Sequence, residues 1–240
     1  MTENVNYIVL SRQMAIQRQM DVIANNIANM NTTAYKAERV LFEEYLMKTD
    51  DGTQLAYVRD FGNARNLEQG EMRNTLNPLD VAISGDGYFE VQSKDGTVYT
   101  RNGHFRVSPD GYLVTASGQR VLDNSGKALA VDPNDPKLDI ASDGTVSSSA
   151  GPIGTLAVVT FQNEQSMTPM GDGLYKTTAA PTPAANSKIL QGFVENANVE
   201  PILEMTRMIE ASRAYQSTQN ILNRDDDIRQ QAIDRLGRVS

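Results

Sequence analysis

IQRQMDVIANNIANM, residues 16–30 of the chain, places apolar side chains at alternating steps of four and three residues. The apolar positions are Ile16, Met20, Ile23, Ile27 and Met30, and Val9 stands one heptad before Ile16. A stripe this narrow is typical of a coiled-coil seam, whereas a helix packed on a globule has a broader apolar face. The stretch therefore predicts an N-terminal helix, from about Tyr7 to Met30, that needs a partner helix.

A second heptad stripe lies near the other end of the chain. Met208, Tyr215 and Leu222 repeat every seven residues, and Met205 belongs to the same pattern. Pro201 suits the first turn of a helix, where its missing N–H has no partner to lose, so we expect a helix from there to about residue 236. Two such helices predict a protein that pairs its own termini and packs them against other subunits.

Between the stripes the chain is rich in short apolar runs and turns. Asp-Gly dipeptides, which favour tight turns between strands, occur at 86–87, 95–96, 110–111, 143–144 and 172–173. We therefore predict an α+β chain: paired N- and C-terminal coiled-coil helices with an inserted antiparallel all-β domain. The expected segments are an N-terminal helix (1–36), an extended arm or hairpin (37–76), the β domain (77–187) and a C-terminal helix (188–240).

Composition restricts the class of protein. The 240-residue chain carries a formal net charge of −8 and has no run of basic residues, so nucleic acid is not an expected partner. The chain contains no cysteine, which excludes disulfides and thiolate sites. No apolar run approaches the roughly 20 residues that span a bilayer, and the first residues lack a basic n-region. We therefore expect no membrane insertion and no cleavable signal peptide.

No motif for catalysis, cofactor binding or metal binding emerges. His104 is the single histidine, and no nucleophile motif accompanies it. Gly85-Asp86-Gly87 lacks the third glycine and the following helix of a dinucleotide loop, so we interpret it as a turn. We predict a protein that is not an enzyme, with no cofactor and no metal site. The rival interpretation is an enzymatic or carbohydrate-binding β domain with helical tails.

Three blocks of the sequence resemble bacterial flagellar rod and hook proteins. Residues 19–36, QMDVIANNIANMNTTAYK, are similar to the N-terminal signature of that family; residues 80–114 resemble its β domain and residues 198–216 its C-terminal helix. The resemblance covers most of the chain in the expected order. The chain length and the N-terminal sequence are most similar to those of the proximal rod members, and the distal rod members are next. A distal rod or hook subunit of the same family is the alternative.

The resemblance implies a structural, non-enzymatic subunit of the basal-body rod, which transmits torque from motor to hook. Its implied partners are copies of itself, other rod proteins and the flagellar type III export apparatus, and its implied location is the periplasmic rod. One position departs from the family. Ala34 stands where the family usually has glycine, and because alanine costs about 1 kcal/mol at positive φ, we expect a different turn there.

The expected assembly interface consists of the two stripes and three neighbouring asparagines. Its residues are Val9, Ile16, Met20, Ile23, Asn25, Asn26, Ile27, Asn29, Met30, Met205, Met208, Tyr215 and Leu222. The asparagines have two interpretations of equal weight: hydrogen bonds between helices that fix the register, or signals that end the helix. The sequence leaves open which stripe positions contact the other end of the same chain and which contact a neighbouring subunit.

Overall fold

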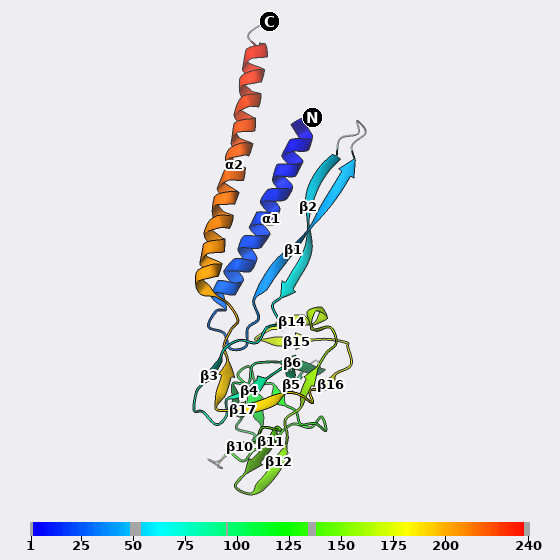
Figure 1. Ribbon diagram of the computed structural model, residues 1–240, viewed down its shortest axis with the longest axis vertical. Coiled ribbons are helices and arrows are strands. Elements are labelled where there is room, and N and C mark those ends of the chain that lie inside the picture. The colour runs from blue at the N-terminus through cyan, green and yellow to red at the C-terminus, as the bar shows by residue number, and fades with distance from the viewer. Residues whose placement is uncertain (1, 49–53, 95, 134–137, 238–240) are drawn as a thin grey trace. The chain divides into compact units, whose positions relative to one another are not determined.

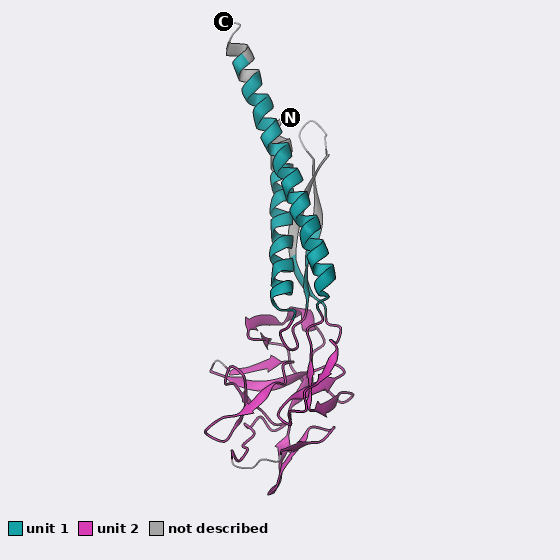
Figure 2. Cartoon of the chain, turned by 90° about the vertical axis from the view of Figure 1, so that its left-hand side faces the viewer, with its two compact units in different colours: residues 1–30, 37–66, 199–240 teal, residues 31–36, 67–198 magenta. Residues whose placement is uncertain are grey.

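The computed structural model describes residues 2–48, 54–94, 96–133 and 138–237 (Figure 1). The chain is α+β, with a long helix near each end and antiparallel sheets between them. Its residues divide into two compact units (Figure 2): a helical unit of residues 1–30, 37–66 and 199–240, and a β unit of residues 31–36 and 67–198. The chain thus crosses between the units at 30/31, 36/37, 66/67 and 198/199.

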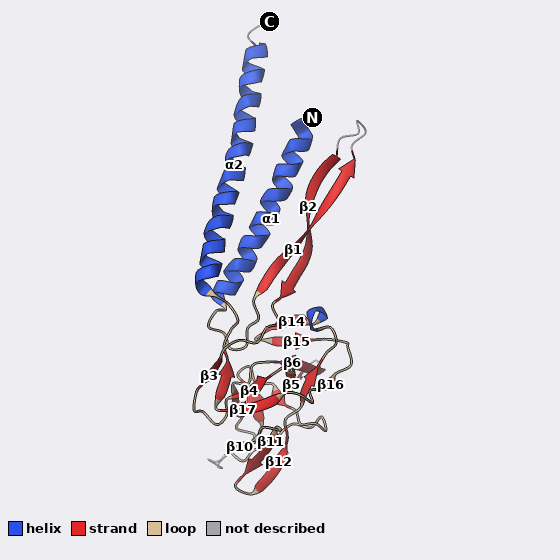
Figure 3. Ribbon diagram, in the orientation of Figure 1, coloured by secondary structure: helices blue, strands red, loops and turns tan. Residues whose placement is uncertain are grey.

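The helical unit contains two helices and one hairpin (Figure 3). Helix α1 spans Thr2–Ala28 and begins earlier than the sequence predicts, whereas α2 spans Pro201–Gly237 and begins at the expected proline. Strands β1 (Glu38–Lys48) and β2 (Gln54–Arg65) pair antiparallel, with a register shift between Leu41 and Phe42. Helix α1 packs against both α2 and this hairpin.

The β unit is built from short strands, most of them three to five residues long. Its strands are β3 (Met72–Asn74), β4 (Val81–Ser84), β5 (Tyr88–Ser93), β6 (Gly96–Thr100), β7 (Phe105–Val107), β8 (Leu113–Thr115), β9 (Arg120–Val121), β10 (Asp139–Ile140), β11 (Thr145–Ser148), β12 (Gly151–Thr155), β13 (Val158–Thr160), β14 (Thr168–Gly171), β15 (Leu174–Lys176), β16 (Thr182–Pro183), β17 (Lys188–Gln191) and β18 (Phe193–Glu195). A 3-10 turn, η1, spans Glu164–Ser166. Residues 188–195, which the sequence analysis groups with the C-terminal helix, therefore form two strands.

The largest sheet has nine strands, seven of them in the order β14-β15-β6-β5-β9-β8-β7, with β13 joining β5 and β16 joining β13. Four of the expected Asp-Gly turns connect paired neighbours: β5–β6, β7–β8, β10–β11 and β14–β15. Asp95 of the first turn lies outside the described residues. The glycines of these dipeptides have positive φ, which only glycine adopts without strain. Local turn chemistry therefore sets this part of the fold.

Two apolar clusters form the core of the β unit. The larger one gathers side chains of β4 to β11, β15, β17 and the loops between them, with Val81, Phe89 and Leu113 fully buried. The smaller one is mainly aromatic: Tyr99 and Phe161 meet edge to face with ring centroids 4.7 Å apart, an arrangement that favours the ring quadrupoles. Because the strands are short and form few hydrogen bonds with each other, burial of these side chains contributes most of the stability of the unit.

The chain leaves α1 through a left-handed residue, Ala34. Its φ is +57°, its side chain is buried, and its N–H donates to the Glu195 carbonyl at 2.7 Å. The expectation of a different turn at this alanine is therefore wrong: the turn keeps positive φ. Burial and the hydrogen bond to β18 stabilise a conformation that alanine alone disfavours.

Substitution of Ala34 tests this strain. Ala34→Val should destabilise the β unit by about 1–3 kcal/mol, because a β-branched side chain at positive φ adds strain in a buried place. In Ala34→Gly, relief of strain opposes the loss of one buried methyl group, so its stability should stay within about 1 kcal/mol of the parent. Urea denaturation followed by circular dichroism measures both. Equal stability of the valine and glycine variants would contradict a left-handed residue 34.

Candidate assembly interface

The apolar stripes of the two helices meet inside the helical unit. Ile16 and Ile23 of α1 and Ala211 of α2 form one buried cluster. The half-buried side chains packed against this cluster are Met20, Ile27, Met208, Ala214 and Tyr215. Six residues of the expected interface, from Ile16 to Tyr215, therefore belong to this cluster or pack against it within their own chain.

Asn26 connects three elements of the helical unit. Its amide Nδ2 donates to the Glu38 carbonyl of β1 at 2.8 Å and to the Glu204 carboxylate of α2 at 3.2 Å. Its Oδ1 accepts the Glu38 N–H at 2.9 Å, and the residue is only 2 % exposed. A buried amide satisfied in this way fixes register, because any slip leaves polar groups unpaired.

The remaining residues of the expected interface lie outside the buried cluster. Asn29 donates through Nδ2 to the carbonyl and side chain of Asn25, 2.9 and 2.8 Å away, within the last turn of α1. Asn26 thus bonds between helices, while Asn25 and Asn29 belong to the end of α1. Val9, Met30 and Leu222 are half-buried, and Met205 is exposed.

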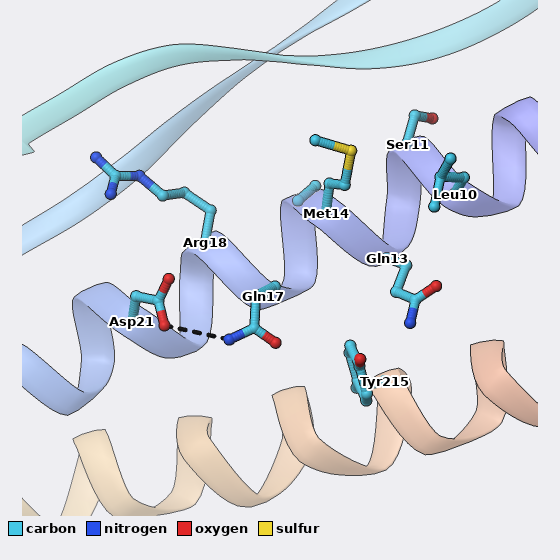
Figure 4. Close-up of a pocket in the computed structure, with 9 residues that line it drawn as sticks. Leu10, Ser11, Gln13, Met14, Gln17, Arg18, Asp21 and Tyr215 are labelled. Atoms are coloured by element: carbon cyan, nitrogen blue, oxygen red, sulfur yellow. Dashed lines mark hydrogen bonds between the residues drawn. The ribbon is translucent and has the colours of Figure 1, made fainter.

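A groove runs along α1 on the side where Tyr215 of α2 approaches (Figure 4). Its volume is about 610 Å³, and Leu10 and Met14 supply its apolar surface, with exposed fractions of 48 and 66 %. Gln17 donates to Asp21 at 3.2 Å along the same face. The residues at 10, 14, 17 and 21 follow steps of four, three and four, so they form one helical face.

Helix α2 also exposes apolar side chains that its pairing with α1 leaves uncovered. Their exposed fractions range from 41 to 83 %, and the residues are Ile202, Leu203, Met205, Ile209, Ile221 and Ile228. Single exposed apolar residues are ordinary, but several on one helix mark a contact surface. The sequence analysis missed all of them except Met205, because they lie outside the heptad stripe.

The β unit contains a buried ion cluster centred on Glu195. One carboxylate oxygen accepts Lys36 Nζ at 2.7 Å and the Gly70 N–H at 2.9 Å, and the other accepts Arg101 Nε at 2.6 Å. All three charged side chains are less than a tenth exposed. Lys36 also donates to the Glu68 carbonyl at 2.7 Å, and Arg101 to the carbonyls of Gly85 and Gly87 at 2.6 and 2.8 Å. No spacing rule in the sequence connects these distant residues.

Two buried cations share one carboxylate, which has an electrostatic consequence. Burial lowers the pKa of the Lys36 ammonium below its ordinary value of 10.5, and the Arg101 charge lowers it further, against the attraction of Glu195. Loss of Glu195 would leave two buried charges unpaired, whereas loss of Lys36 would leave a neutral Arg101–Glu195 pair. The cluster therefore depends most on its carboxylate.

No cluster of metal-ligating side chains occurs among the described residues. The one histidine, His104, is exposed and lies 2.6 Å from the Asp80 carboxylate. Within the same described part of the chain, no helix is long and apolar enough to cross a membrane. A helix pair with apolar outward faces, joined in one chain to a β unit, defines a structural assembly subunit.

Three family models match the chain in order. "Flagella basal body rod protein" matches residues 7–36, "Flagellar hook protein FlgE/F/G D1 domain" matches 82–148, and "Flagellar basal body rod FlgEFG protein C-terminal" matches 190–235. The chain is 38 % identical to the flagellar basal-body rod protein FlgF of Caulobacter vibrioides, over 99 % of this chain and 100 % of that protein. It is 32 % identical to FlgF of Mesorhizobium japonicum, over 98 % of each, and 33 % identical to FlgG of Bacillus subtilis, over 95 and 97 %.

The chain belongs to the flagellar basal-body rod family, and it is a structural subunit of the rod. The resemblance that the sequence blocks indicate is therefore confirmed. The matched N-terminal segment contains Asn26 and ends at Lys36, and the matched C-terminal segment contains Glu195 and Glu204. The terminal segments thus contain Asn26, Glu204 and two charged residues of the ion cluster, Lys36 and Glu195, whereas Arg101 lies in the segment that matches the D1 domain.

Substitutions in the ion cluster should differ sharply in cost. Glu195→Gln should destabilise the β unit by about 3–5 kcal/mol, because two cations stay buried without a counter-charge. Lys36→Met should cost about 1–2 kcal/mol, the value of the lost hydrogen bonds to Glu68 and Glu195. Denaturant unfolding of both variants measures the difference. Equal costs would contradict a cluster that depends on its carboxylate.

The pH dependence of stability provides a separate check on Lys36. The unfolded chain holds this proton more tightly, because the folded pKa lies below 10.5. Stability from this group should therefore rise as pH increases from the folded pKa towards 10.5. The difference in unfolding free energy between the parent and Lys36→Met should grow over that interval. A constant difference would show that Lys36 has an ordinary pKa.

Proposed function

We propose that this rod subunit assembles through its helical unit, with α1 and α2 as an intrachain coiled-coil pair and the β domain inserted between them. The partners are copies of the same chain and neighbouring rod subunits. The family membership and the similarity to FlgF proteins favour a proximal position in the rod. The subunit stacks axially and transmits torque from motor to hook.

Dense side-chain packing gives such an assembly its stiffness. Torque shears one subunit against the next, and interdigitated apolar side chains resist sliding because displacement opens voids. The intrachain cluster of Ile16, Ile23 and Ala211 stiffens each subunit. The exposed apolar faces of both helices then supply the contacts between subunits.

The proposal includes a route to the periplasmic rod. Membership of the rod family favours export through the flagellar type III apparatus, without signal cleavage. The subunit needs no cofactor and performs no catalysis in this role. Its work is mechanical.

The observation that carries the assembly proposal is the exposure of apolar side chains on a helix that already has one partner. Ile209 of α2 is 53 % exposed, whereas Ile23, in the intrachain cluster, is 4 % exposed. Substitutions of these two isoleucines therefore distinguish effects on assembly from effects on folding. The first should matter to neighbouring subunits and the second to the subunit itself.

Ile209→Asp should leave stability within about 0.5 kcal/mol, as for most surface substitutions, but should abolish swimming and incorporation into basal bodies. Ile23→Asp should unfold the helix pair, because it buries a charge without a partner. Circular dichroism of the purified variants and immunoblots of isolated basal bodies measure the two effects. Ile209→Val is the matched control and should swim normally. Normal rods containing Ile209→Asp would refute the outward contact.

A further inference from the structure

Three asparagines of the β unit fold back on the backbone in the same way. The side-chain Oδ1 atoms of Asn74, Asn77 and Asn102 accept the N–H of the residue two positions further on, at 3.0, 3.3 and 3.0 Å. Asparagine commonly forms such Asx turns in loops. The hydrogen bond closes a ring that contains the side-chain carbon Cγ and the backbone nitrogen of the next residue, so each turn holds an amide carbon close to a potential nucleophile.

The three turns differ in the residue that follows the asparagine. Pro78 has no N–H, and the Thr75 N–H donates to the Gly192 carbonyl at 2.8 Å. Gly103 follows Asn102, and among the described residues its N–H donates to no acceptor. Glycine also has no Cβ that would hinder the approach of its nitrogen. Of the three nitrogens, the one of Gly103 is therefore available to attack the preceding side chain.

Both polar atoms of the Asn102 amide favour this attack. The His104 N–H donates to Oδ1 at 3.0 Å, and a donor at the atom that gains negative charge stabilises a tetrahedral intermediate. The amide Nδ2 donates no hydrogen bond within the described part of the chain, so nothing there retains it as a leaving group. The residue is half-buried, and its exposed part gives water access to the product.

Packing requires a glycine at position 103. A Cβ on Gly103 would lie 1.7 Å from the Val81 carbonyl oxygen, so no larger residue fits without a shift of the backbone. The Gly103 carbonyl accepts the Val81 N–H at 2.9 Å, which joins the turn to β4. The fold therefore imposes on Asn102 the neighbour that leaves its amide carbon most open to attack.

We propose that Asn102 is a site of spontaneous deamidation in the folded chain. The Gly103 nitrogen attacks Asn102 Cγ, the bond from Cγ to Nδ2 breaks, and the amide nitrogen leaves as ammonia with the proton from Gly103. A succinimide ring remains. Water opens this ring: attack at Cγ gives aspartate, and attack at the backbone carbonyl carbon of residue 102 gives isoaspartate. The inference concerns one turn of the β unit and is independent of how the subunit assembles.

The two products differ in their effect on the β unit. Aspartate keeps the length of the backbone, and its carboxylate can still accept the His104 N–H. Isoaspartate adds one carbon atom to the main chain between Arg101 and Gly103. On one side of the added atom the buried Arg101 donates to Glu195, and on the other side Gly103 pairs with Val81. Isoaspartate should therefore destabilise the unit, because these two contacts no longer have their native spacing.

Peptide mapping of the full-length chain tests the inference. The folded chain and the guanidinium-unfolded chain are incubated in the same mildly alkaline buffer, and tandem mass spectrometry distinguishes isoaspartate, which only a succinimide yields, from aspartate. We expect isoaspartate at position 102 of the folded chain, formed at a rate within about tenfold of that in the unfolded chain, because the turn already holds the reacting atoms together. Asn74 and Asn77 are the internal controls and should remain asparagine in the folded chain.

An Asn102 that stays intact in the folded chain would overturn the inference, and its conversion in the unfolded chain alone would show that the fold protects it. Conversion of Asn74 in the folded chain would contradict the role of the free Gly103 N–H. Asn102→Asp is the matched control for the added charge and should keep the unfolding midpoint of the fresh parent in guanidinium. Aged parent that contains isoaspartate should unfold at a lower concentration of denaturant.

Discussion

The carboxylate of Glu195 is the constraint on which the β unit depends. Three segments separated by up to 159 residues converge on it: Lys36 just before one crossing to the helical unit, Gly70 just after another, and Glu195 itself before the last. Gly70 lies so close to Asn196 that an added Cβ would meet its carbonyl oxygen at 2.0 Å. A carboxylate that accepts bonds from three donors holds these segments in one arrangement.

A buried cluster of this kind is poor evidence of high stability, because removing charges from water costs free energy that their attraction only partly offsets. Its value lies in specificity. Lys36 needs both the Glu68 carbonyl and the Glu195 carboxylate, so a shifted strand leaves a buried ammonium unpaired. The left-handed Ala34, two residues earlier, follows from the same constraint, since its N–H bonds to the Glu195 carbonyl.

The helical unit divides its apolar residues between inside and outside. Ile16 and Ile23 of α1 pack with Ala211 of α2, and the hydrogen bond of Asn26 to Glu204 fixes the register of the two helices. Apolar side chains of α2, among them Ile209 and Ile221, remain exposed. A rod subunit needs both kinds of surface, because it must fold as one chain and also present contacts that continue to the next.

The sequence by itself determined the long helices, the start of α2 at Pro201, the Asp-Gly turns and the family. Each of these depends on local propensity or on a short repeating pattern, and both are visible in the sequence alone. It also predicted that the two terminal helices pair, but not which stripe positions meet inside the chain. Only the tertiary structure decided that Ile16 and Ile23 pack with Ala211, that Ile209 and Ile221 remain exposed, and that Lys36 and Arg101 share Glu195. Those outcomes depend on contacts between residues far apart in the sequence, and no local pattern encodes which distant side chains become neighbours.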